Sequence, residues 1–597
     1  MSVSIETRGA DAATVANSVT VADSGRVLRV RWLGRLHYAD AHAVQRALFE
    51  RPEGDWLLLL EHPHVYTLGV RAKPEHVLVD PGTVGAELIR TDRGGDVTYH
   101  GPGQLVGYPI LSVPMGPDAT PRYVHGVEQV VIDALADLGL PGCGRLRGYP
   151  GVWAGVGGPA PRKICAIGVR LSRGRSMHGF ALNVDPDLTM FGHIVPCGIS
   201  DKAVTSLAAE GVDVPMRDVV EAVARRAAAH WGFASIERQD AAWRVRTSDL
   251  SAFTRGQGPG SPVLARQPVG GPQPAPTPRR PAAPTSAQPV RLLGRLAEAG
   301  VATEDALPID TRKPPWLRVQ ANLGPEYRAL RRTMRSLSLV TVCEEAGCPN
   351  IYECWADGTA TFMINGDRCT RACGFCLVDT RRPLAPEPDE PRRVAEAVAR
   401  MGLAHAVVTA VARDDLPDGG AEGFAATIRA IHEHCPGTAV EVLIPDCHGS
   451  PAALETIFLA RPEVLNHNIE TVLRLQRAVR PSASYGRSLA VLSRARSAGL
   501  VTKSGLILGM GETEEEVLGA LADLHGIGVD IVTLGQYLRP TTHHLPVARW
   551  WTPDEFARLK AAGEAKGIGH VEASPLTRSS HHARQAAAAV LGPGARP

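Results

Sequence analysis

Six of the eleven cysteines in this 597-residue chain lie in one short stretch, from Cys343 to Cys376. They form two triplets: Cys343, Cys348 and Cys354, spaced C-x4-C-x5-C, then Cys369, Cys373 and Cys376, spaced C-x3-C-x2-C. Three thiolates can hold three irons of a [4Fe–4S] cluster and leave the fourth iron open to a substrate. A structural zinc site is the alternative, but it needs four ligands, usually as two C-x2-C pairs, and the second triplet supplies one such pair. The spacing therefore favours a catalytic iron–sulfur centre.

Charge and hydropathy limit the classes of partner. Lys plus Arg (64) nearly equals Asp plus Glu (62), so the net charge of +2 gives no support for a nucleic-acid or anionic-membrane surface. The chain has neither the basic-then-apolar start of a secretory signal nor an apolar run of about 18 residues. We therefore expect no nucleic acid and no membrane among its partners. The cysteines then indicate metal ligands and reactive thiols in a reducing compartment, which predicts a cytoplasmic protein.

A proline-rich segment divides the chain. Between Pro259 and Pro289 there are ten prolines among mostly small and polar residues, with no acidic or aromatic side chain, and this composition predicts an extended tether. The expected layout is a disordered N-terminus (1–25), a first domain (26–250), a linker (251–290) and a second domain (291–597). No short-period repeat relates the halves, which indicates a fusion of two unrelated domains.

The two halves differ in their hydrophobic pattern. The first mixes a strand-like run at 27–32, a helix-like stretch at 40–50 and a buried-strand run at 56–60, which is typical of an α+β domain. The second alternates helical stretches with short apolar runs, among them 406–408 and 505–508. About six such repeats predict a parallel α/β sheet that forms an open or partial (β/α)6 barrel.

The second triplet directly follows a strand-like run, 361–364, and Phe375 precedes its last cysteine. This C-x3-C-x-aromatic-C loop resembles that of the radical S-adenosylmethionine (SAM) enzymes. With the first triplet about fifteen residues upstream, the chain from about Pro314 to Ala583 resembles lipoyl synthase. Further stretches that carry this resemblance are 343–350, 413–420, 466–471, 509–513 and 543–546.

The resemblance to lipoyl synthase implies SAM and two [4Fe–4S] clusters as cofactors. The SAM-binding cluster would use Cys369, Cys373 and Cys376. The auxiliary cluster would use Cys343, Cys348, Cys354 and a serine of an Arg-Ser-Ser-Tyr motif, which is Ser580 here. Contacts to the methionine part of SAM fall on Gly509, Gly511 and Glu512. Two positions depart from the family pattern, since His581 replaces the tyrosine of that motif and Ala412 replaces an aspartate.

The chemistry of that family explains why it needs a radical. Sulfur insertion at an unactivated C–H bond is beyond any side-chain base. The resemblance implies that two SAM cleavages each give a 5′-deoxyadenosyl radical, that C6 and C8 of an octanoyl chain receive sulfur, and that the auxiliary cluster is consumed as its source. Flavodoxin or ferredoxin is the kind of electron donor expected. The alternative is a non-catalytic iron–sulfur scaffold or redox sensor, which would not cleave SAM.

The densest motif of the first half is the glycine-rich stretch 93–109, in which glycines permit close approach of backbone to a ligand. With the stretches 162–169, 178–183 and 194–199 it resembles octanoyltransferase, an acyltransferase related to biotin and lipoate protein ligases. The resemblance covers about Val30 to Glu210 and implies the α+β fold of those ligases.

Carried over by position, the resemblance makes Cys197 the nucleophile and Lys163 its partner. A cation or base near a cysteine raises its thiolate fraction, and a lysine can be either. The implied substrate-binding residues are Arg93, Gly94, Gly95, His100, Gly101, Ala166, Ile167, Gly168, His178, Gly179 and Ala181. Cys165 is a competing thiol, because strand alternation puts it on the same face as Lys163.

These patterns together predict a bifunctional enzyme of protein lipoylation. Its donor would be octanoyl-acyl carrier protein, and its acceptors lipoyl domains of 2-oxoacid dehydrogenases and the glycine cleavage H protein. The tether would raise the effective concentration of one site near the product of the other. The alternative for the first half is an ATP-dependent lipoate ligase, which shares the fold, activates a free acid and does not need a nucleophilic Cys197.

Overall fold

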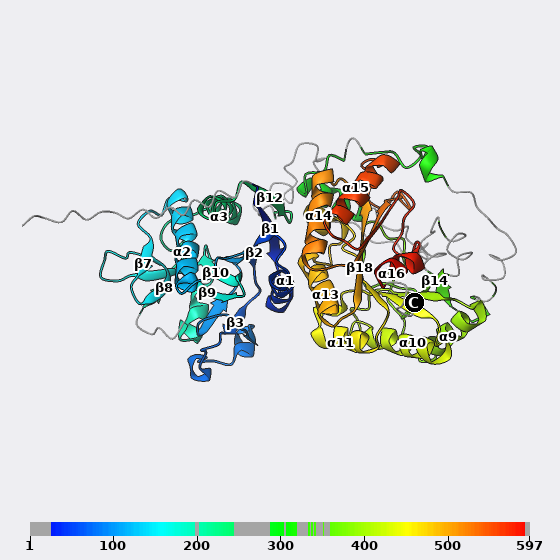
Figure 1. The fold of residues 1–597 in the computed structure, drawn as a ribbon, viewed down its shortest axis with the longest axis horizontal. Coiled ribbons are helices and arrows are strands. Elements are labelled where there is room, and N and C mark those ends of the chain that lie inside the picture. The colour runs from blue at the N-terminus through cyan, green and yellow to red at the C-terminus, as the bar shows by residue number, and fades with distance from the viewer. Residues whose placement is uncertain are drawn as a thin grey trace, which may run out of the picture.

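The computed structural model describes residues 25–196, 202–243, 287–303, 306–318 and 359–591, with a few positions between 332 and 350. The expected disordered N-terminus and most of the expected linker lie outside these residues, as do Cys197 and the first cysteine triplet. Two bodies are visible in Figure 1, one for each half of the chain.

The N-terminal half is built on a mixed sheet of nine strands with the order β12-β1-β2-β6-β10-β9-β8-β7, and β11 adds to β9. Its strands are β1 (Val27–Arg35), β2 (Asp55–Glu61), β6 (Gln104–Ile110), β7 (Gly144–Leu146), β8 (Tyr149–Ala154), β9 (Arg162–Ser172), β10 (Arg175–Asn183), β11 (Ala203–Val204) and β12 (Ser235–Asp240). A smaller sheet of β4 (Glu87–Arg90), β3 (Val65–Leu68) and β5 (Val97–His100) lies beside it.

Helices cover both faces of the large sheet. Leu57 and Leu59 of β2 share a core with α2 (Ala119–Asp137) and α3 (Met216–His230), whereas Leu58 and Leu60 pack with α1 (Tyr38–Glu50) on the opposite face. Burial on both faces explains why this strand reads as a continuous apolar run. The strands and helix expected at 27–32, 40–50 and 56–60 are present, and the α+β prediction is confirmed.

The C-terminal half contains a second sheet whose strands follow one another in chain order from β13 to β20. The strands are β13 (Val340–Thr341), β14 (Thr359–Ile364), β15 (His405–Ala410), β16 (Ala439–Leu443), β17 (Val464–Asn466), β18 (Val501–Leu508), β19 (Ile531–Gln536) and β20 (His570–Ala573). Strands β14 to β20 pair in parallel, and β13 pairs antiparallel to β14. The parallel-sheet prediction is confirmed, and the sheet is wider than the six strands expected.

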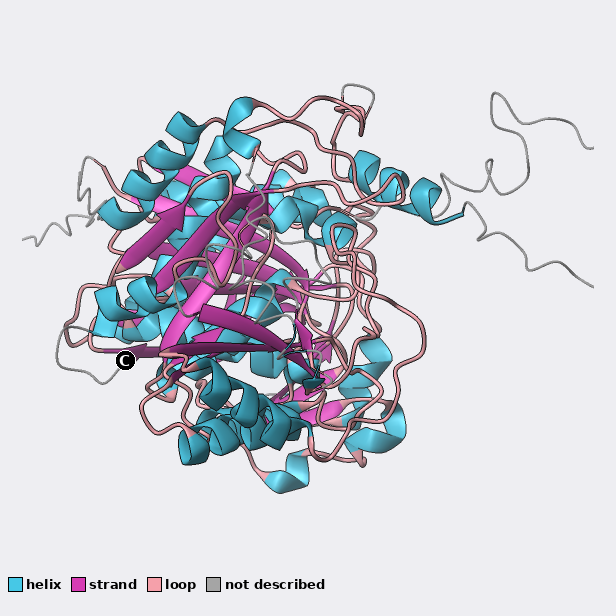
Figure 2. Ribbon diagram, turned by 90° about the vertical axis from the view of Figure 1, so that its right-hand side faces the viewer, coloured by secondary structure: helices cyan, strands magenta, loops and turns pink. Residues whose placement is uncertain are grey.

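Helices surround this sheet (Figure 2). They include α9 (Glu390–Met401), α10 (Ala421–His434), α11 (Pro451–Leu459), α12 (Gln476–Val479), α13 (Tyr485–Ser497), α14 (Glu514–Gly526), α15 (Pro553–Ala565) and α16 (Ala583–Leu591). A further helix, α5 (Ala287–Glu298), begins inside the segment assigned to the linker and buries Leu296 in the core. Some buried residues of the strands are charged. Lys503 Nζ of β18 forms a buried ion pair with Glu441 Oε1 of β16 at 2.9 Å.

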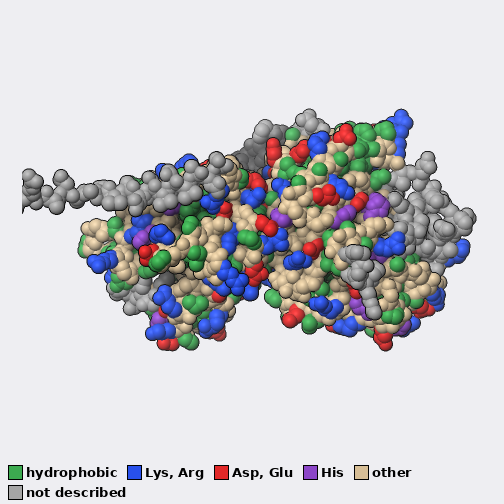
Figure 3. All heavy atoms as spheres, viewed as in Figure 1, with side chains coloured by type: hydrophobic (Ala, Val, Ile, Leu, Met, Phe, Trp, Pro, Cys, Tyr) green, Lys and Arg blue, Asp and Glu red, His purple; other side chains and the backbone are tan. Residues whose placement is uncertain are grey.

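None of the helices in the described ranges combines the length and apolar character needed to cross a membrane. Acidic and basic side chains are interspersed over the face shown in Figure 3, in line with the near-neutral net charge.

Candidate active sites

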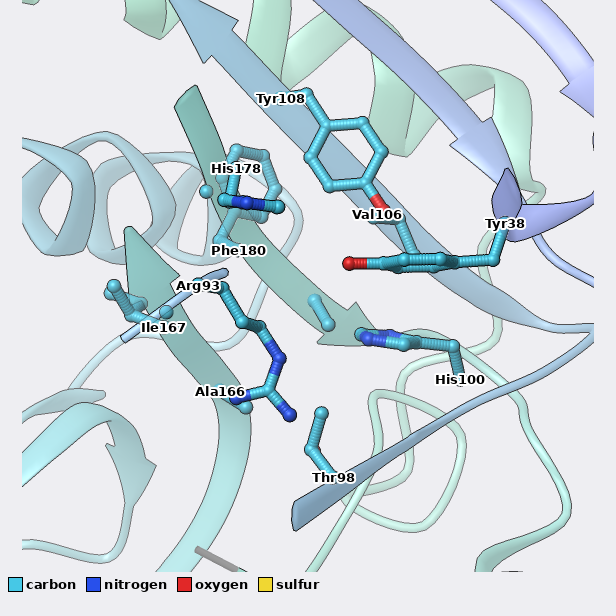
Figure 4. Close-up of a pocket in the computed structure, with 13 residues that line it drawn as sticks. Tyr38, Arg93, Thr98, His100, Val106, Tyr108, Ala166, Ile167, His178 and Phe180 are labelled. Atoms are coloured by element: carbon cyan, nitrogen blue, oxygen red, sulfur yellow. The ribbon is translucent and has the colours of Figure 1, made fainter. Parts of the chain in front are cut away.

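A pocket in the N-terminal half lies between α1, the strands β5, β6, β9 and β10, and the loop that precedes β5 (Figure 4). Eight predicted substrate-binding residues line it: Arg93, His100, Ala166, Ile167, Gly168, His178, Gly179 and Ala181. Gly94, Gly95 and Gly101 do not line it but lie in the adjoining turns. Five further lining residues were not predicted: Tyr38, Thr98, Val106, Tyr108 and Phe180.

Buried hydrogen bonds fix the guanidinium of Arg93. It donates from Nη2 to the Thr67 carbonyl at 2.6 Å, from Nε to Thr67 Oγ1 at 3.1 Å, and from Nη1 to its neighbour's carbonyl. Gly94 follows without a side chain and donates its N–H to the Val169 carbonyl at 3.1 Å. The glycines of this loop thus let it approach β9, which aims Arg93 into the pocket.

Burial disfavours the charged form of the imidazoles in and next to the pocket. Burial lowers the pKa of His100 well below its ordinary value, and that of His62 to about 4. His100 Nδ1 is 2.8 Å from Gln104 Oε1, and His62 Nε2 is 2.7 Å from the Tyr108 hydroxyl. His100 lines the pocket together with Val106 and Ile167, whereas His62 lies behind Tyr108 and holds its hydroxyl; Arg93 is the cation in this lining.

His178 is held in a conformation that side chains seldom adopt, with φ of 60°. Its Nε2 lies 2.8 Å from Asp92 Oδ1, and the hydrogen bond from His178 holds the pKa of Asp92 well below its ordinary range. His42 of α1 and Arg170 of β9 also contact Asp92. Because Nε2 faces a carboxylate, it carries the proton, and the buried Nδ1 has no hydrogen-bond partner among the described residues.

Lys163 is buried on β9, directly opposite Trp153 of β8. Its Nζ lies 4.8 Å from the centroid of the Trp153 ring, within the range of a cation–π interaction. On the other side of β9, Val204 of β11 pairs with Lys163. The competing thiol, Cys165, lies in the core, where burial raises its pKa far above the ordinary value and keeps it protonated.

In the C-terminal half, Cys369, Cys373 and Cys376 lie on the loop after β14, as predicted from sequence. The other cysteines that the structure describes are Cys143, Cys165, Cys435 and Cys447, none of which is on this loop. The sulfur of Cys369 accepts backbone N–H groups from Arg371 at 3.4 Å and Ala412 at 3.3 Å. Burial raises the pKa of Cys376 to about 12, so cluster binding would have to displace protons from this loop.

Backbone hydrogen bonds anchor the cysteine loop on three sides. The Thr370 N–H donates to the Ala412 carbonyl at 3.0 Å, Gly374 N–H to the Val479 carbonyl at 2.8 Å, and Leu545 N–H to the Gly374 carbonyl at 2.9 Å. Ala412 therefore contacts the loop through backbone groups, which a residue of another type would also supply. The departure from the family pattern at this position leaves these contacts intact.

Charged side chains from neighbouring strand ends meet beside the loop. Arg371 donates to Asp414 Oδ1 at 2.7 Å and to Asp446 Oδ1 at 2.6 Å, and these carboxylates follow β15 and β16. Glu470 and Arg480 are close enough to influence the pKa of Cys373, which burial raises. The loop thus sits at the carboxyl ends of the parallel strands, where ligands bind in such sheets.

The turn 509–512 after β18 is stabilised from within. Glu512 is buried, and its carboxylate accepts hydrogen bonds from the N–H groups of Gly509 and Met510 and from Trp551 Nε1. Gly509 and Gly511 have φ of 110° and 115°, which favours glycine. These contacts give Glu512 a structural task, and the expected contact of this turn with SAM stays a prediction.

The loop that carries the C-terminal serines contacts residues from two other parts of the chain. Asn350, two residues after Cys348, donates from Nδ2 to the Leu576 carbonyl at 2.6 Å. Asn468, after β17, donates from Nδ2 to Ser579 Oγ at 2.7 Å. His581 stacks on His582 with 3.8 Å between ring centroids. The loop that carries Ser580 thus contacts Asn468 at a strand end and follows Leu576, whose carbonyl binds Asn350.

The residues that sequence reasoning missed come from distant elements. Tyr38 lines the pocket from α1, and Asp92, directly before the glycine-rich motif, holds the lining residue His178; nothing in the local sequence marks either one. Tyr108 and Phe180 lie within the motifs, and their place on the strands β6 and β10 was the available signal. Glu470 likewise belongs to the stretch 466–471.

Family descriptions match both halves of the chain. Residues 37–228 match the lipoyl protein ligase A/B catalytic domain, residues 302–348 the N-terminal domain of lipoyl synthase, and residues 363–524 the radical SAM superfamily. The sequence-based expectation of a fusion is therefore confirmed at the level of these families.

Curated relatives agree for the C-terminal half. Lipoyl synthase of Rubrobacter xylanophilus is 58% identical over 275 residues, 46% of this chain and 86% of the relative. Lipoyl synthase of Mycobacterium avium is 58% identical over 282 residues, 47% of this chain and 92% of the relative. Among solved structures, one from an archaeal lipoylation system, a bi-partite lipoate protein ligase and its E2 lipoyl domain from Thermoplasma acidophilum, is 20% identical with a TM-score of 0.30. The matched region covers 41% of this chain and 98% of the solved archaeal chain.

These matches imply SAM and [4Fe–4S] chemistry for the second half and ligase-type or transferase chemistry for the first. The chain belongs to the lipoyl synthase family, and it carries a lipoyl protein ligase A/B catalytic domain fused ahead of the radical SAM domain.

Proposed function

We propose that this chain is a bifunctional enzyme of protein lipoylation. The N-terminal half transfers octanoyl from acyl carrier protein to a lysine of a lipoyl domain through a thioester on Cys197. The C-terminal half then inserts sulfur at C6 and C8 of the attached chain. The acceptors are lipoyl domains of 2-oxoacid dehydrogenases and the glycine cleavage H protein, the reductant is a flavodoxin or ferredoxin, and the reaction takes place in the cytoplasm.

The position of Lys163 carries the proposal for the first half. Pro196 and Lys202, which flank the five residues from 197 to 201, line one cavity together with Val204, and Val204 pairs with Lys163. The pairing of Val204 with the buried Lys163 supports a role for this lysine as the cation of a nucleophilic cysteine, because a nearby positive charge stabilises the thiolate. Cys165 does not compete, because burial keeps it a thiol.

Acyl transfer then needs no external energy source. Attack of the Cys197 thiolate on the carrier thioester forms a new thioester and expels the carrier thiolate, which takes a proton from the Lys163 ammonium. Attack of the acceptor amine next forms the amide and expels the Cys197 thiolate, and the Lys163 amine, now neutral, takes the proton that the acceptor amine loses. The apolar lining of the pocket and the lowered pKa of His100 support binding of an acyl chain there, and Arg93, the cation of this lining, is the group that would orient the acyl carbonyl.

The competing reading is an ATP-dependent lipoate ligase. Purified full-length protein is given octanoyl-acyl carrier protein without ATP, or free octanoate with ATP, and octanoylation of a lipoyl domain is followed by mass spectrometry. We expect product in the first mixture and none in the second. Cys197→Ala should abolish it, and Cys143→Ala, a buried cysteine elsewhere in the domain, should not. Product only with ATP would establish the ligase instead.

For the second half, Cys369, Cys373 and Cys376 would hold the SAM-binding cluster. Cys343, Cys348, Cys354 and Ser580 would hold the auxiliary one, and the contact of Asn350 with Leu576 supports that grouping. The donor set fits, since three thiols share a loop and the Cys369 sulfur accepts two N–H groups, a contact that stabilises thiolate on iron. When bound, the clusters and SAM supply the radical and the sulfur. The chain itself holds the cysteine loop rigid and orders charges beside it through Arg371.

Anaerobic reconstitution tests this half. Two [4Fe–4S] clusters predict about eight irons per chain, and addition of SAM, reductant and an octanoylated peptide predicts 5′-deoxyadenosine and lipoyl product. Ser580→Ala should lower the iron count toward four without loss of the SAM-binding cluster. Full iron content with no SAM cleavage would instead indicate an iron–sulfur scaffold or redox sensor.

A further inference from the structure

The two halves of the chain meet over a continuous face. Helix α1 of the N-terminal half lies against α13 of the C-terminal half, and β12 reaches α14 (Figure 1). One cluster of buried apolar side chains includes Leu36, Leu48 and Trp56 from the first half and Leu489 and Leu524 from the second. Apolar surface on both halves is therefore removed from water where they touch.

A buried ion pair crosses this face. Arg31 Nε of β1 donates to Asp523 Oδ1 of α14 at 2.7 Å, and both side chains are only 2% exposed. The Tyr485 hydroxyl of α13 donates to the other oxygen of Asp523 at 2.8 Å, and Glu237 of β12 accepts from Arg31. A charge can leave water at this depth only when it is paired and hydrogen-bonded, and Asp523 meets both requirements through contacts that include the opposite half.

A second polar contact lies toward the edge of the face. The buried carboxylate of Asp40, on α1, accepts a hydrogen bond from Arg487 Nε at 3.1 Å and forms an ion pair with Arg494 Nη1 at 2.9 Å. Both arginines belong to α13. Gln239 of β12 donates from Nε2 to the Glu516 carbonyl at 3.2 Å. The face thus combines an apolar centre with directional polar contacts, as specific interfaces do.

Three glycines fit the helices of the C-terminal half to this face. A Cβ built on Gly486, Gly519 or Gly526 would come within 3 Å of Leu36, Gln239 or Trp56 of the other half. Glycine inside a helix is unfavourable compared with alanine, so a packing reason is expected for it. Here the reason is that side chains of the N-terminal half pack directly against these three glycines.

We propose that the two halves form a specific complex that holds without the proline-rich connection. The surface of α13 and α14 is a docking site for the α1–β1–β12 face of the ligase-like domain. This inference depends on neither proposed activity. If the proposed function also holds, the two active sites keep fixed places, and the lipoyl domain is the part that travels between them.

Cutting the connection tests the complex. A protease site is inserted between residues 259 and 280 of the full-length chain, ahead of α5, and the folded protein is cleaved and analysed by size exclusion at micromolar concentration. We expect the two fragments to elute together, near the mass of the uncut 63.5 kDa chain. Separate elution of two folded fragments would overturn the proposal.

Charge reversal shows whether this face is responsible. Asp523→Lys should weaken the association of the cleaved halves by about a hundredfold or more, because it leaves the buried Arg31 facing a like charge. Asp40→Lys tests the same face from the other half, so that misfolding of one fragment does not decide the result. The matched control is Glu396→Lys on α9, whose ion pairs lie within its own helix, and it should bind like wild type. Unchanged association in both interface variants would overturn the assignment of this surface.

Discussion

The two active sites of this chain are assembled in opposite ways. In the C-terminal half, three thiols lie within one short loop, and backbone hydrogen bonds to Ala412, Val479 and Leu545 hold that loop in place. In the N-terminal half, the pocket draws on side chains from Tyr38 to Ala181, and side-chain hydrogen bonds set their positions. The cysteine loop of the C-terminal half should therefore tolerate substitution of the residues around its three thiols. The pocket of the N-terminal half should instead respond to changes in residues that never touch substrate.

The largest effect is expected at a cluster thiol. Cys376→Ala removes one of the three proposed cluster ligands on the loop, so SAM cleavage should fall below detection while octanoyl transfer by the other half is unchanged. Anaerobic assay of 5′-deoxyadenosine, with octanoyl transfer measured on the same preparation, checks both. Cys435→Ala, at the end of α10, is the control and should keep both activities. Undiminished SAM cleavage in the Cys376 variant would remove the loop from the mechanism.

A smaller loss is expected where a ring holds the proposed catalytic lysine. Trp153→Leu removes the cation–π contact to Lys163, worth about 0.5–2 kcal/mol, and should lower kcat/KM for octanoyl transfer by about 2- to 30-fold. Trp153→Phe keeps an aromatic face and should retain most of the activity. Thermal melts of both variants separate this loss from instability. Equal activity in the leucine and phenylalanine variants would show that the ring does not act on Lys163.

Asp92 tests positioning from farther away. Asp92→Asn removes the charge that orients His178, and octanoyl transfer should fall about tenfold, mainly in kcat, because the imidazole loses its fixed proton position. Asp137→Asn, at the end of α2 and paired with Arg225 and Arg226, is the matched control and should have no effect on transfer. A KM effect alone would mean that Asp92 shapes the pocket without orienting His178.

The smallest effect is expected at Ala412, where the chain departs from its family. Because the backbone of this residue makes the contacts to the cysteine loop, Ala412→Asp should change the rate of SAM cleavage by less than about twofold. The measurement is deoxyadenosine formation at saturating SAM. A gain of tenfold or more would show that the side chain at this position takes part, against the contrast drawn between the two sites.

The same contrast explains what the sequence could predict. The cysteine loop and the strand before it are local in sequence, and both are found where expected. Tyr38 and Asp92 were missed because only the tertiary fold brings them to His100 and His178. Strand β20 was missed because His570 and Glu572 alternate with apolar residues, so it shows no apolar run.

The contact between the halves could not be predicted at all. Arg31 and Asp523 are separated by 492 positions, and each looks like an ordinary surface charge in its own segment. The start of α5 was also missed, because Pro289 and Gly294 are residues that disfavour a helix, although Leu296 of this helix is buried. In both cases the residues are buried by elements that are distant in sequence, and a local sequence pattern does not indicate such burial.

The proposed sequence of octanoyl transfer followed by sulfur insertion can be tested in a single reaction mixture. Reconstituted full-length protein is mixed with octanoyl-acyl carrier protein, an unmodified lipoyl domain, SAM and reductant, without ATP, and the lipoyl domain is analysed by intact mass spectrometry. The account predicts a lipoylated domain, preceded by an octanoylated intermediate that accumulates when SAM is left out. A domain that stays unmodified until free octanoate and ATP are supplied would contradict it.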